Sequence, residues 1–352
     1  MNPKIKFAIA GAIITAVIAV SFIANPSPLL LQNNTTTTTD VLRIGYFPNI
    51  NHAQAVIGLG NGDFQKALGD VKVETQIFNA GPSAMEALFA NQVDATYVGP
   101  NPAINAYIKS GGEALRIITG AASGGAVFVV RNDAGIDSAD DFAGKKFASP
   151  QLGNTQDVAL RAYLLKNGYK TTENGGNVEV IPAKNPDILT LMLKKEVDGA
   201  WVPEPWGAKL LKETDSRIFV DERDLWPEGK FVTVHLVINP EYLENHPDIV
   251  KKLLAAHIDE TIWINQNLEE SFIVFNIELE KLTGKTIAED EFQDAFSRME
   301  ITYDPVKDSL FKSANDAFDI GFLGDTRPDL SKIYDLKLLN EVLEEKNLPT
   351  IP

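Results

Sequence analysis

Residues 149–169, with the sequence SPQLGNTQDVALRAYLLKNGY, place a turn of small uncharged polar side chains directly before a helical pattern. The backbone N–H groups in the first turn of a helix have no intrahelical partner and carry partial positive charge. Such a turn can therefore hold an anion without a basic side chain. The pattern also fits simple helix capping, because Asn154 and Asp157 have capping-box spacing. The residues of the turn are Gly153, Asn154, Thr155 and Gln156.

The composition excludes several other kinds of site. The chain of 352 residues has 48 acidic and 32 basic residues and a net charge of −16, so nucleic-acid binding is not expected. It has no cysteine, which removes disulfides, thiolate catalysis and cysteine–zinc sites. Its 4 histidines show no His-x-x-x-His spacing, and neither a Gly-x-Ser-x-Gly elbow nor a P-loop is present. We therefore expect no enzymatic activity, no metal and no cofactor.

The beginning of the chain indicates export. Lys4 and Lys6 precede an uncharged apolar stretch at residues 7–24. Its length lies between a secretory signal and a membrane span, so residues 1–25 are either an uncleaved anchor, which we favour, or a removed signal peptide. Residues 26–40 form a Thr-rich linker, in which the acceptor patterns at Asn33 and Asn34 fit either glycosylation or chance. In both cases the rest of the chain is expected outside the cytoplasm, at the cell surface or in the periplasm.

Two segments offset by 104 residues share one pattern and predict a duplicated architecture. Residues 82–102 and 186–206 each read as helix, acidic turn, short buried strand and proline-rich loop. The same offset pairs the strand VLRIG with KKFAS. Ser83 with Glu86 predicts a capping box for the first helix, and Asn185 an N-cap for the second. The predicted fold class is α/β, with two doubly wound lobes joined by two crossover strands.

A cleft between the lobes is the predicted site, because open α/β sheets bind ligands beyond the carboxyl ends of their strands. The loops expected there are rich in Gly, Pro, Asn, Ser and Thr and poor in Lys and Arg. They comprise residues 48–52, 81–83, 99–102, 153–156 and 203–206.

The predicted domain boundaries follow from two extended apolar crossings, at residues 126–131 and 230–238. Helices beyond the second crossing are expected to cover the first lobe. The boundaries are 41–128 with 234–325 for lobe 1, 129–233 for lobe 2, and 326–352 for a C-terminal helical tail.

Five segments, taken in order, resemble the solute-binding proteins of ABC importers, within the sulfonate/nitrate/taurine type. The resemblance covers roughly residues 41–325. It implies a periplasmic binding protein-like fold of type II, a small anionic or zwitterionic ligand, hinge closure, a monomer, and delivery to a membrane permease with its ATPase. The segments are the exported stalk, GYFPNINHAQAVIG, GPSAMEALFANQVDATYVGPNPAI, SPQLGNTQDVALRAYL and WVPEPWG.

The resemblance also implies which residues face the ligand. It places some on the wall of each lobe, with His52 near the rim, His235 near the hinge, and Glu204 and Trp206 in an acid-Pro-aromatic loop. The ligand-binding candidates are Asn49, Asn51, His52, Ser83, Asn101, Ser123, Gly124, Gly153, Asn154, Thr155, Gln156, Glu204, Trp206 and His235.

Glu204 has two interpretations, because a bare carboxylate in an anion pocket is costly unless it is paired. It either pairs with Arg43, Arg161 or a lysine, or it meets an ammonium group on a zwitterion such as taurine. The predicted function is capture of a small oxyanion, with an alkanesulfonate or taurine as first choice. Nitrate, bicarbonate or a thiamine-like pyrimidine in the same role, and a tethered sensory ectodomain, are the alternatives.

Overall fold

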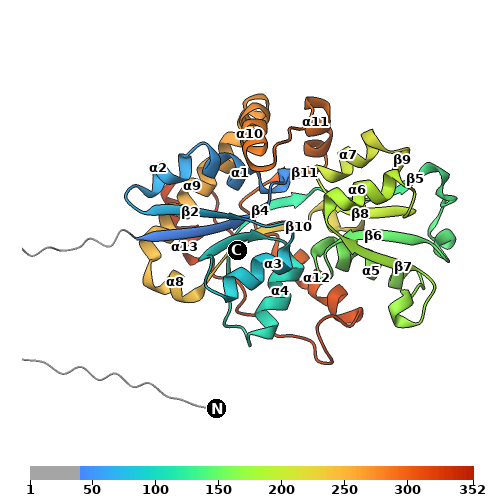
Figure 1. Cartoon of the computed structure of the whole chain (residues 1–352). Helices are drawn as coiled ribbons and strands as arrows, with labels where there is room; N and C mark the ends of the chain where they lie inside the picture. Colours follow the sequence, from blue (N-terminus) through green and yellow to red (C-terminus); the bar gives the residue numbers. More distant parts are fainter. Residues whose placement is uncertain (1–39) are drawn as a thin grey trace, which may run out of the picture. The chain divides into compact units, whose positions relative to one another are not determined.

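Two β-sheets organise residues 40–352, the part of the chain that the computed structural model describes (Figure 1). The expected anchor at residues 7–24, the linker up to residue 39, and Asn33 and Asn34 lie outside the described residues. Between residues 40 and 352 no helix is long and apolar enough to span a membrane.

The first sheet has six strands in the order β11-β4-β10-β3-β1-β2. Strands β1, β2 and β3 pair in parallel, and β10 runs antiparallel between β3 and β4. We call this sheet and the helices packed on it the first lobe. Its strands are β1 (Val41–Tyr46), β2 (Lys72–Ile77), β3 (Ala95–Val98), β4 (Arg116–Gly124), β10 (Val232–Ile238) and β11 (Met299–Ile301).

The second sheet has five strands in the order β7-β6-β8-β5-β9. Strands β6, β7 and β8 pair in parallel, and β5 runs antiparallel to β8 and β9. This sheet and its helices are the second lobe. Its strands are β5 (Ala126–Arg131), β6 (Lys146–Pro150), β7 (Glu179–Ala183), β8 (Gly199–Pro203) and β9 (Ser216–Asp221).

The duplication expected from the sequence is present in the sheets. The run β10-β3-β1-β2 of the first lobe has the same arrangement as β5-β8-β6-β7 of the second, with one antiparallel strand beside three parallel ones. The paired segments of the sequence become β1 and β6, and β3 and β8, at equivalent places. The predicted fold class of two α/β lobes is confirmed.

Helices cover both faces of each sheet (Figure 1). The second lobe carries α5 (Thr155–Lys166), α6 (Asn185–Leu193) and α7 (Trp206–Glu213). The other helices are α1 (Ala53–Gly60), α2 (Asp63–Leu68), α3 (Gly81–Phe89), α4 (Pro100–Lys109), α8 (Pro240–Asn245), α9 (Pro247–Gln266), α10 (Leu268–Thr283), α11 (Glu289–Ser297), α12 (Lys307–Asp319) and α13 (Lys337–Glu345).

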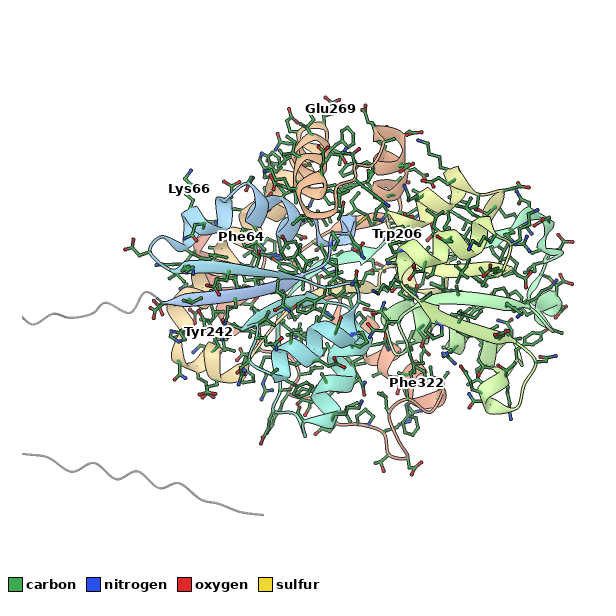
Figure 2. The ribbon with its side chains drawn as sticks, viewed as in Figure 1. Phe64, Lys66, Trp206, Tyr242, Glu269 and Phe322 are labelled. Carbon is green, nitrogen blue, oxygen red and sulfur yellow. The ribbon has the colours of Figure 1, made fainter. Side chains whose placement is uncertain are left out.

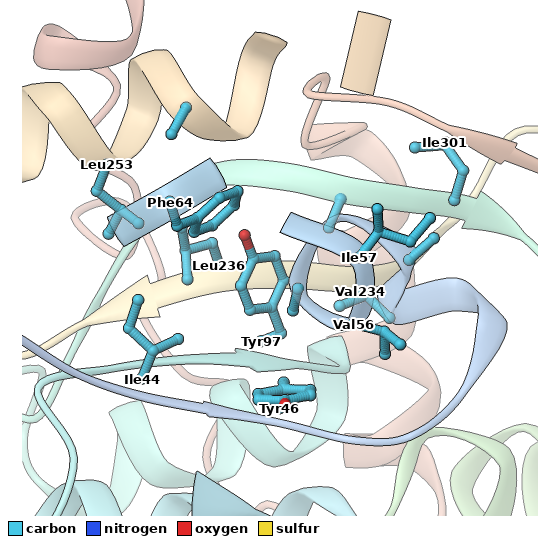
Figure 3. Close-up of a cluster of buried hydrophobic side chains, with 14 of the residues drawn as sticks. Ile44, Tyr46, Val56, Ile57, Phe64, Tyr97, Val234, Leu236, Leu253 and Ile301 are labelled. Carbon is cyan, nitrogen blue, oxygen red and sulfur yellow. The ribbon is translucent and has the colours of Figure 1, made fainter. Parts of the chain in front are cut away.

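Each sheet buries apolar side chains on both of its faces, as a sheet between two helical layers requires. Figure 3 shows one such cluster in the first lobe, where Ile44 and Tyr97 meet Phe64 and Leu253. The second lobe is held by aromatic packing around Phe128, which is fully buried. Its ring lies 5.0 to 6.3 Å, between centroids, from those of Phe142, Phe147, Tyr163, Trp201 and Phe219.

The chain first crosses from one lobe to the other at Gly124 and Gly125, where β4 ends and β5 follows. Gly124 and Gly125 both have φ of +73°, a backbone conformation that residues other than glycine rarely adopt. A Cβ at Gly124 would also lie 2.6 Å from the carbonyl oxygen of Arg298. The chain therefore needs glycine here to turn from one sheet into the other.

Local helix signals were the weakest of the sequence predictions. The capping box at Ser83 is wrong, because α3 begins at Gly81 and the Ser83 hydroxyl donates to the carbonyl of Ala80 at 2.8 Å. Asn185 is the first residue of α6 and not its cap. Asn154 occupies the N-cap position of α5 but makes no capping hydrogen bond with its side chain.

The expected helical covering of the first lobe also needs correction. The short strand β11 lies within that region and extends the first sheet beside β4. In addition, α12 packs on both α4 and α5, and α11 packs on α7, so these two helices touch both lobes.

Truncation of the central aromatic ring tests the packing of the second lobe. We expect Phe128→Ala to lower the free energy of unfolding by about 3–5 kcal/mol, because it removes a large buried side chain and leaves a cavity. Urea titration is the measurement, and Phe89→Ala is the control, since Phe89 is 49% exposed. A loss at Phe128 no larger than that at Phe89 would contradict this packing.

Candidate functional site

A small cavity of about 20 Å³ lies where the carboxyl ends of parallel strands from both sheets meet. We call it the amide cavity, because six of its lining side chains are Asn or Gln. None of its lining residues carries a formal charge at neutral pH. They are Phe47, Asn49, Asn51, His52, Asn79, Ala80, Gly99, Asn154, Thr155, Gln156, Asn185, Pro203, Thr233 and Val234.

The structure brings some of the predicted site residues together here. The loop after β1 and the start of α5 contribute them, from opposite lobes. They are Asn49, Asn51, His52, Asn154, Thr155 and Gln156.

Sequence reasoning missed other lining residues, among them Asn79 and Asn185. Each follows a parallel strand, β2 or β7, by two residues. The rule of strand carboxyl ends could therefore have found both, but Asn185 was interpreted only as a helix cap.

Four buried polar atoms of the amide cavity have no hydrogen-bond partner among residues 40–352. They are Asn51 Oδ1, His52 Nδ1, Thr155 Oγ1 and Asn185 Oδ1. Most buried polar atoms in folded proteins are paired, because an unpaired one costs free energy. The Thr155 hydroxyl can donate to a bound molecule, and the two amide oxygens can accept from a bound donor or water, so the amide cavity offers hydrogen-bonding capacity that its own residues leave unused.

The cavity is electrically neutral as well as polar. Burial lowers the pKa of His52 to about 3, so its ring carries no charge at neutral pH. The ring packs on Phe47, with 4.4 Å between the ring centroids. An anion bound here would meet no carboxylate, and an ammonium group would find no counter-charge.

Asp157 does not compete for the amides at the start of α5. Its carboxylate accepts from the Ser149 hydroxyl at 2.6 Å and from the Gly153 N–H at 2.9 Å, and it pairs with Arg161 at 3.1 Å. These contacts turn the negative charge toward the second lobe. The N–H groups of the first turn of α5 have no intrahelical partner and are not bound by this carboxylate.

The two lobes touch each other at the amide cavity. Asn154 Oδ1 accepts from the Gly81 N–H of the first lobe at 3.3 Å. A Cβ added at Gly99 would lie 2.2 Å from Thr155 Oγ1, so only glycine permits this approach. The turn at residues 153–156 thus completes the wall of the other lobe.

Glu204 is engaged elsewhere and does not line the amide cavity. Its Oε1 accepts from Arg298 Nε at 2.6 Å and its Oε2 from the Ala208 N–H at 2.9 Å. The expected partners are wrong, because Arg43 binds Asp94 and Arg161 binds Asp157. Burial raises the pKa of Glu204, and the Arg298 guanidinium opposes that rise.

Arg298 makes this contact a bond between the lobes. It comes directly before β11 of the first lobe, whereas Glu204 follows β8 of the second. Its other two nitrogens bind the Asp294 carboxylate at 2.7 and 2.6 Å. The sequence pattern gave no sign of this pair, which joins residues 94 positions apart.

Trp206 forms the wall of a neighbouring hollow. Its Nε1 donates to Asn49 Oδ1 of the first lobe at 3.3 Å. The hollow has a volume of about 240 Å³ and is lined from both lobes. We call it the chamber; its lining includes Phe47, Phe78, Lys184, Trp206, Lys209, Leu279, Lys285, Ile287 and Glu291.

The remaining predicted residues lie outside both the amide cavity and the chamber. Asn101 accepts from the Ser313 hydroxyl at 2.8 Å, and His235 Nε2 lies 3.0 Å from the carbonyl oxygen of Pro305. Ser123 borders an open hollow near the hinge. The candidates that the structure does not bring to the amide cavity or chamber are Ser83, Asn101, Ser123, Gly124, Gly153, Glu204 and His235.

Another cavity, of about 360 Å³, lies between α5, α12 and the second crossing. It contains Thr155 but no other predicted residue. The loops after the parallel strands contribute only Pro100 and Thr155 to it, so the amide cavity is the better candidate. In residues 40–352 no group of three or more His, Asp or Glu side chains could hold a metal.

Removal of the buried arginine tests the bond between the lobes. We expect Arg298→Met to lower the free energy of unfolding by about 3–5 kcal/mol at pH 7, because the buried Glu204 loses the cation that offsets the cost of its burial. Addition of Glu204→Gln should recover much of this loss in urea titrations. Arg327→Met is the control, with an expected change within about 0.5 kcal/mol, because its partner Asp319 is exposed. Equal effects at the two arginines would contradict a buried pair.

Comparisons with known proteins agree with this fold. The taurine-binding periplasmic protein of Escherichia coli (strain K12) is 25% identical over 205 residues, which is 58% of this chain and 61% of that protein. The nitrate-binding protein NrtA from Synechocystis PCC 6803 has a TM-score of 0.72 at 15% identity, over 89% of this chain and 90% of that one. The alkanesulfonate-binding protein SsuA from Xanthomonas axonopodis pv. citri, bound to MOPS, has a TM-score of 0.69 at 15% identity, over 84% and 98%. Below 25% identity these structural matches show the fold.

A match between a family profile and a longer part of the sequence identifies the family. The family profile aligns with residues 36–274, which is more than half of the chain. This range includes both parallel strand sets and every residue of the amide cavity. The chain belongs to the NMT1-like family.

Proposed function

We propose that the chain is the extracytoplasmic solute-binding subunit of an ABC importer and that it captures a small organic oxyanion in the amide cavity. The lobes close on the solute by rotation at the crossings, and the loaded protein delivers it to a membrane permease with its ATPase. The protein acts as a monomer, and the N-terminal segment holds it at the membrane. It performs no chemical reaction on the solute.

One observation carries this proposal: the unpaired buried polar atoms of both lobes converge on an uncharged cavity at the strand carboxyl ends. Of these atoms, the Thr155 hydroxyl and the His52 ring nitrogen can donate to an oxyanion, whereas Asn51 Oδ1 and Asn185 Oδ1 only accept and would reach it through a bridging water or a reversed amide. A solute held by groups of both lobes bridges them and so favours the closed form. The helix start at Thr155 supplies partial positive charge for an oxyanion. The names of the taurine-, nitrate- and alkanesulfonate-binding relatives support an oxyanion as the ligand, and two of the three support an organic one.

Within this class the site favours an oxyanion without an ammonium group. Glu204, the acid that could have met an ammonium, has both oxygens occupied by Arg298 and the Ala208 N–H. The residues around the amide cavity include no other carboxylate. An alkanesulfonate therefore fits better than taurine.

Ligand preference is measured by calorimetric titration of the exported part with ethanesulfonate and taurine, which differ by one ammonium group. We expect ethanesulfonate to bind at least about 10-fold more tightly, because an unpaired buried ammonium is costly. Its affinity should stay constant from about pH 5 to about pH 8, since His52 is neutral throughout that range. Binding of nitrate but of neither sulfonate would contradict the organic ligand class.

The unpaired hydroxyl at the start of α5 gives a second test. Thr155→Val keeps the shape that fits against Gly99 but removes Thr155 Oγ1. We expect ethanesulfonate affinity to fall about 10- to 100-fold, the range for a lost hydrogen bond to a charged group.

The melting temperature of the ligand-free Thr155→Val variant should stay the same or rise, because a buried unpaired polar atom is removed. Thr190→Val on the exposed face of α6 is the control and should change neither quantity. Unchanged affinity in the Thr155 variant would remove this residue from the site.

A further inference from the structure

The amide cavity adjoins the chamber. The two hollows share Phe47, Asn49, Asn79 and Asn185 in their walls. The amide cavity has about 20 Å³ and the chamber about 240 Å³. A solute whose head fills the first hollow has room for its body in the second, because the two share four lining residues, whereas the cavity of about 360 Å³ shares only Thr155 with the amide cavity.

The inner walls of the chamber are apolar and come from both lobes. Phe47, Phe78, Leu279 and Ile287 of the first lobe are all buried to at least 91%. Trp206 of the second lobe (labelled in Figure 2) also lines the chamber, and its Nε1 donates to Asn49, which lines both hollows. Such walls favour a hydrocarbon body over a polar one.

Three lysines also line the chamber, in a protein with a net charge of −16. Lys209 pairs with Glu213 at 2.6 Å. Lys184 and Lys285 are exposed, and within residues 40–352 neither has a carboxylate within 4.0 Å. The one acidic lining residue, Glu291, lies 3.5 Å from Lys212. The chamber thus has an excess of positive charge.

We infer that the preferred solute is an elongated organic dianion, with an oxyanion head in the amide cavity, an apolar spacer in the chamber and a second anionic group near Lys184 and Lys285. This inference rests on the proposed function. The neutral cavity selects one end by hydrogen bonds, and the lysines select the other by charge. A monoanionic alkanesulfonate would satisfy only the first of these two preferences.

Three probes with the same six-carbon spacer test this inference: hexanesulfonate, 1,6-hexanedisulfonate and 6-aminohexanesulfonate. Calorimetric titration of the exported part should show the disulfonate about 10-fold tighter than hexanesulfonate and the aminosulfonate weaker than both. The difference should shrink as salt is raised, because exposed charges are screened. Equal affinities for disulfonate and hexanesulfonate would overturn the inference.

Variants locate the second charge site. The double variant Lys184→Met, Lys285→Met should remove the advantage of the disulfonate and leave hexanesulfonate affinity within about 2-fold. The control is Lys66→Met, Lys252→Met, which changes the net charge equally with exposed lysines that line neither hollow (Lys66 in Figure 2). The control should keep the full advantage; loss in both double variants would overturn the inference, because net charge would then explain it.

Binding kinetics distinguish lysines that contact the bound dianion from lysines that only attract it from solution. Lysines that touch the bound dianion should slow its dissociation, whereas lysines that only attract anions raise the association rate. A gain confined to association would overturn the inference. Binding of ethanesulfonate without binding of any six-carbon probe would also overturn it and leave the proposed function intact. Failure of ethanesulfonate itself would refute the proposed function.

Discussion

The structure depends on one constraint, which is that buried polar atoms need partners. In the amide cavity each lobe presents polar atoms that its own fold leaves unpaired, namely Asn51 Oδ1 and His52 Nδ1 from the first and Thr155 Oγ1 and Asn185 Oδ1 from the second. Direct bonds between the lobes, from Gly81 to Asn154 and from Trp206 to Asn49, leave these four atoms without a partner. A molecule that satisfies both sets is held by both lobes. Under the proposed function, binding and closure are therefore one event, and the affinity for the solute includes the free energy of bringing the lobes together.

Charge is present around this site but is kept apart from it. Asp157 is paired with Arg161, and Glu204 is paired with Arg298 across the lobes. Both carboxylates follow strands whose ends point at the cleft, so each would repel an anion if it were free. The arginines therefore do more than stabilise the fold: they neutralise the two acids closest in sequence to the amide cavity. The remaining basic groups lie farther out, in the chamber.

The equivalent strands and several residues of the amide cavity were predictable, because they follow from residue patterns within short segments of the chain. The offset of 104 residues placed β1 with β6 and β3 with β8. The strand-end rule located Asn49, Asn51 and residues 154–156, because the carboxyl ends of parallel strands must share one edge of a sheet. Two predicted ligand-binding residues, Asn101 and His235, do not line the amide cavity, because their contacts depend on long-range packing. Asn101 follows β3, but its side chain contacts Ser313, which lies 212 residues away in the sequence. His235 lies in β10, but its side chain contacts Pro305, which lies 70 residues away.

The sequence by itself determined the two-lobed α/β class, the uncharged polar turn at the start of α5, and the absence of thiol chemistry, since these follow from periodicity, residue type and composition. The tertiary structure decided which polar atoms stay unpaired, which arginine neutralises Glu204, and which residues line both the amide cavity and the chamber. The physical reason is that pairing depends on distances between segments far apart in the chain, and only the packed lobes fix those distances.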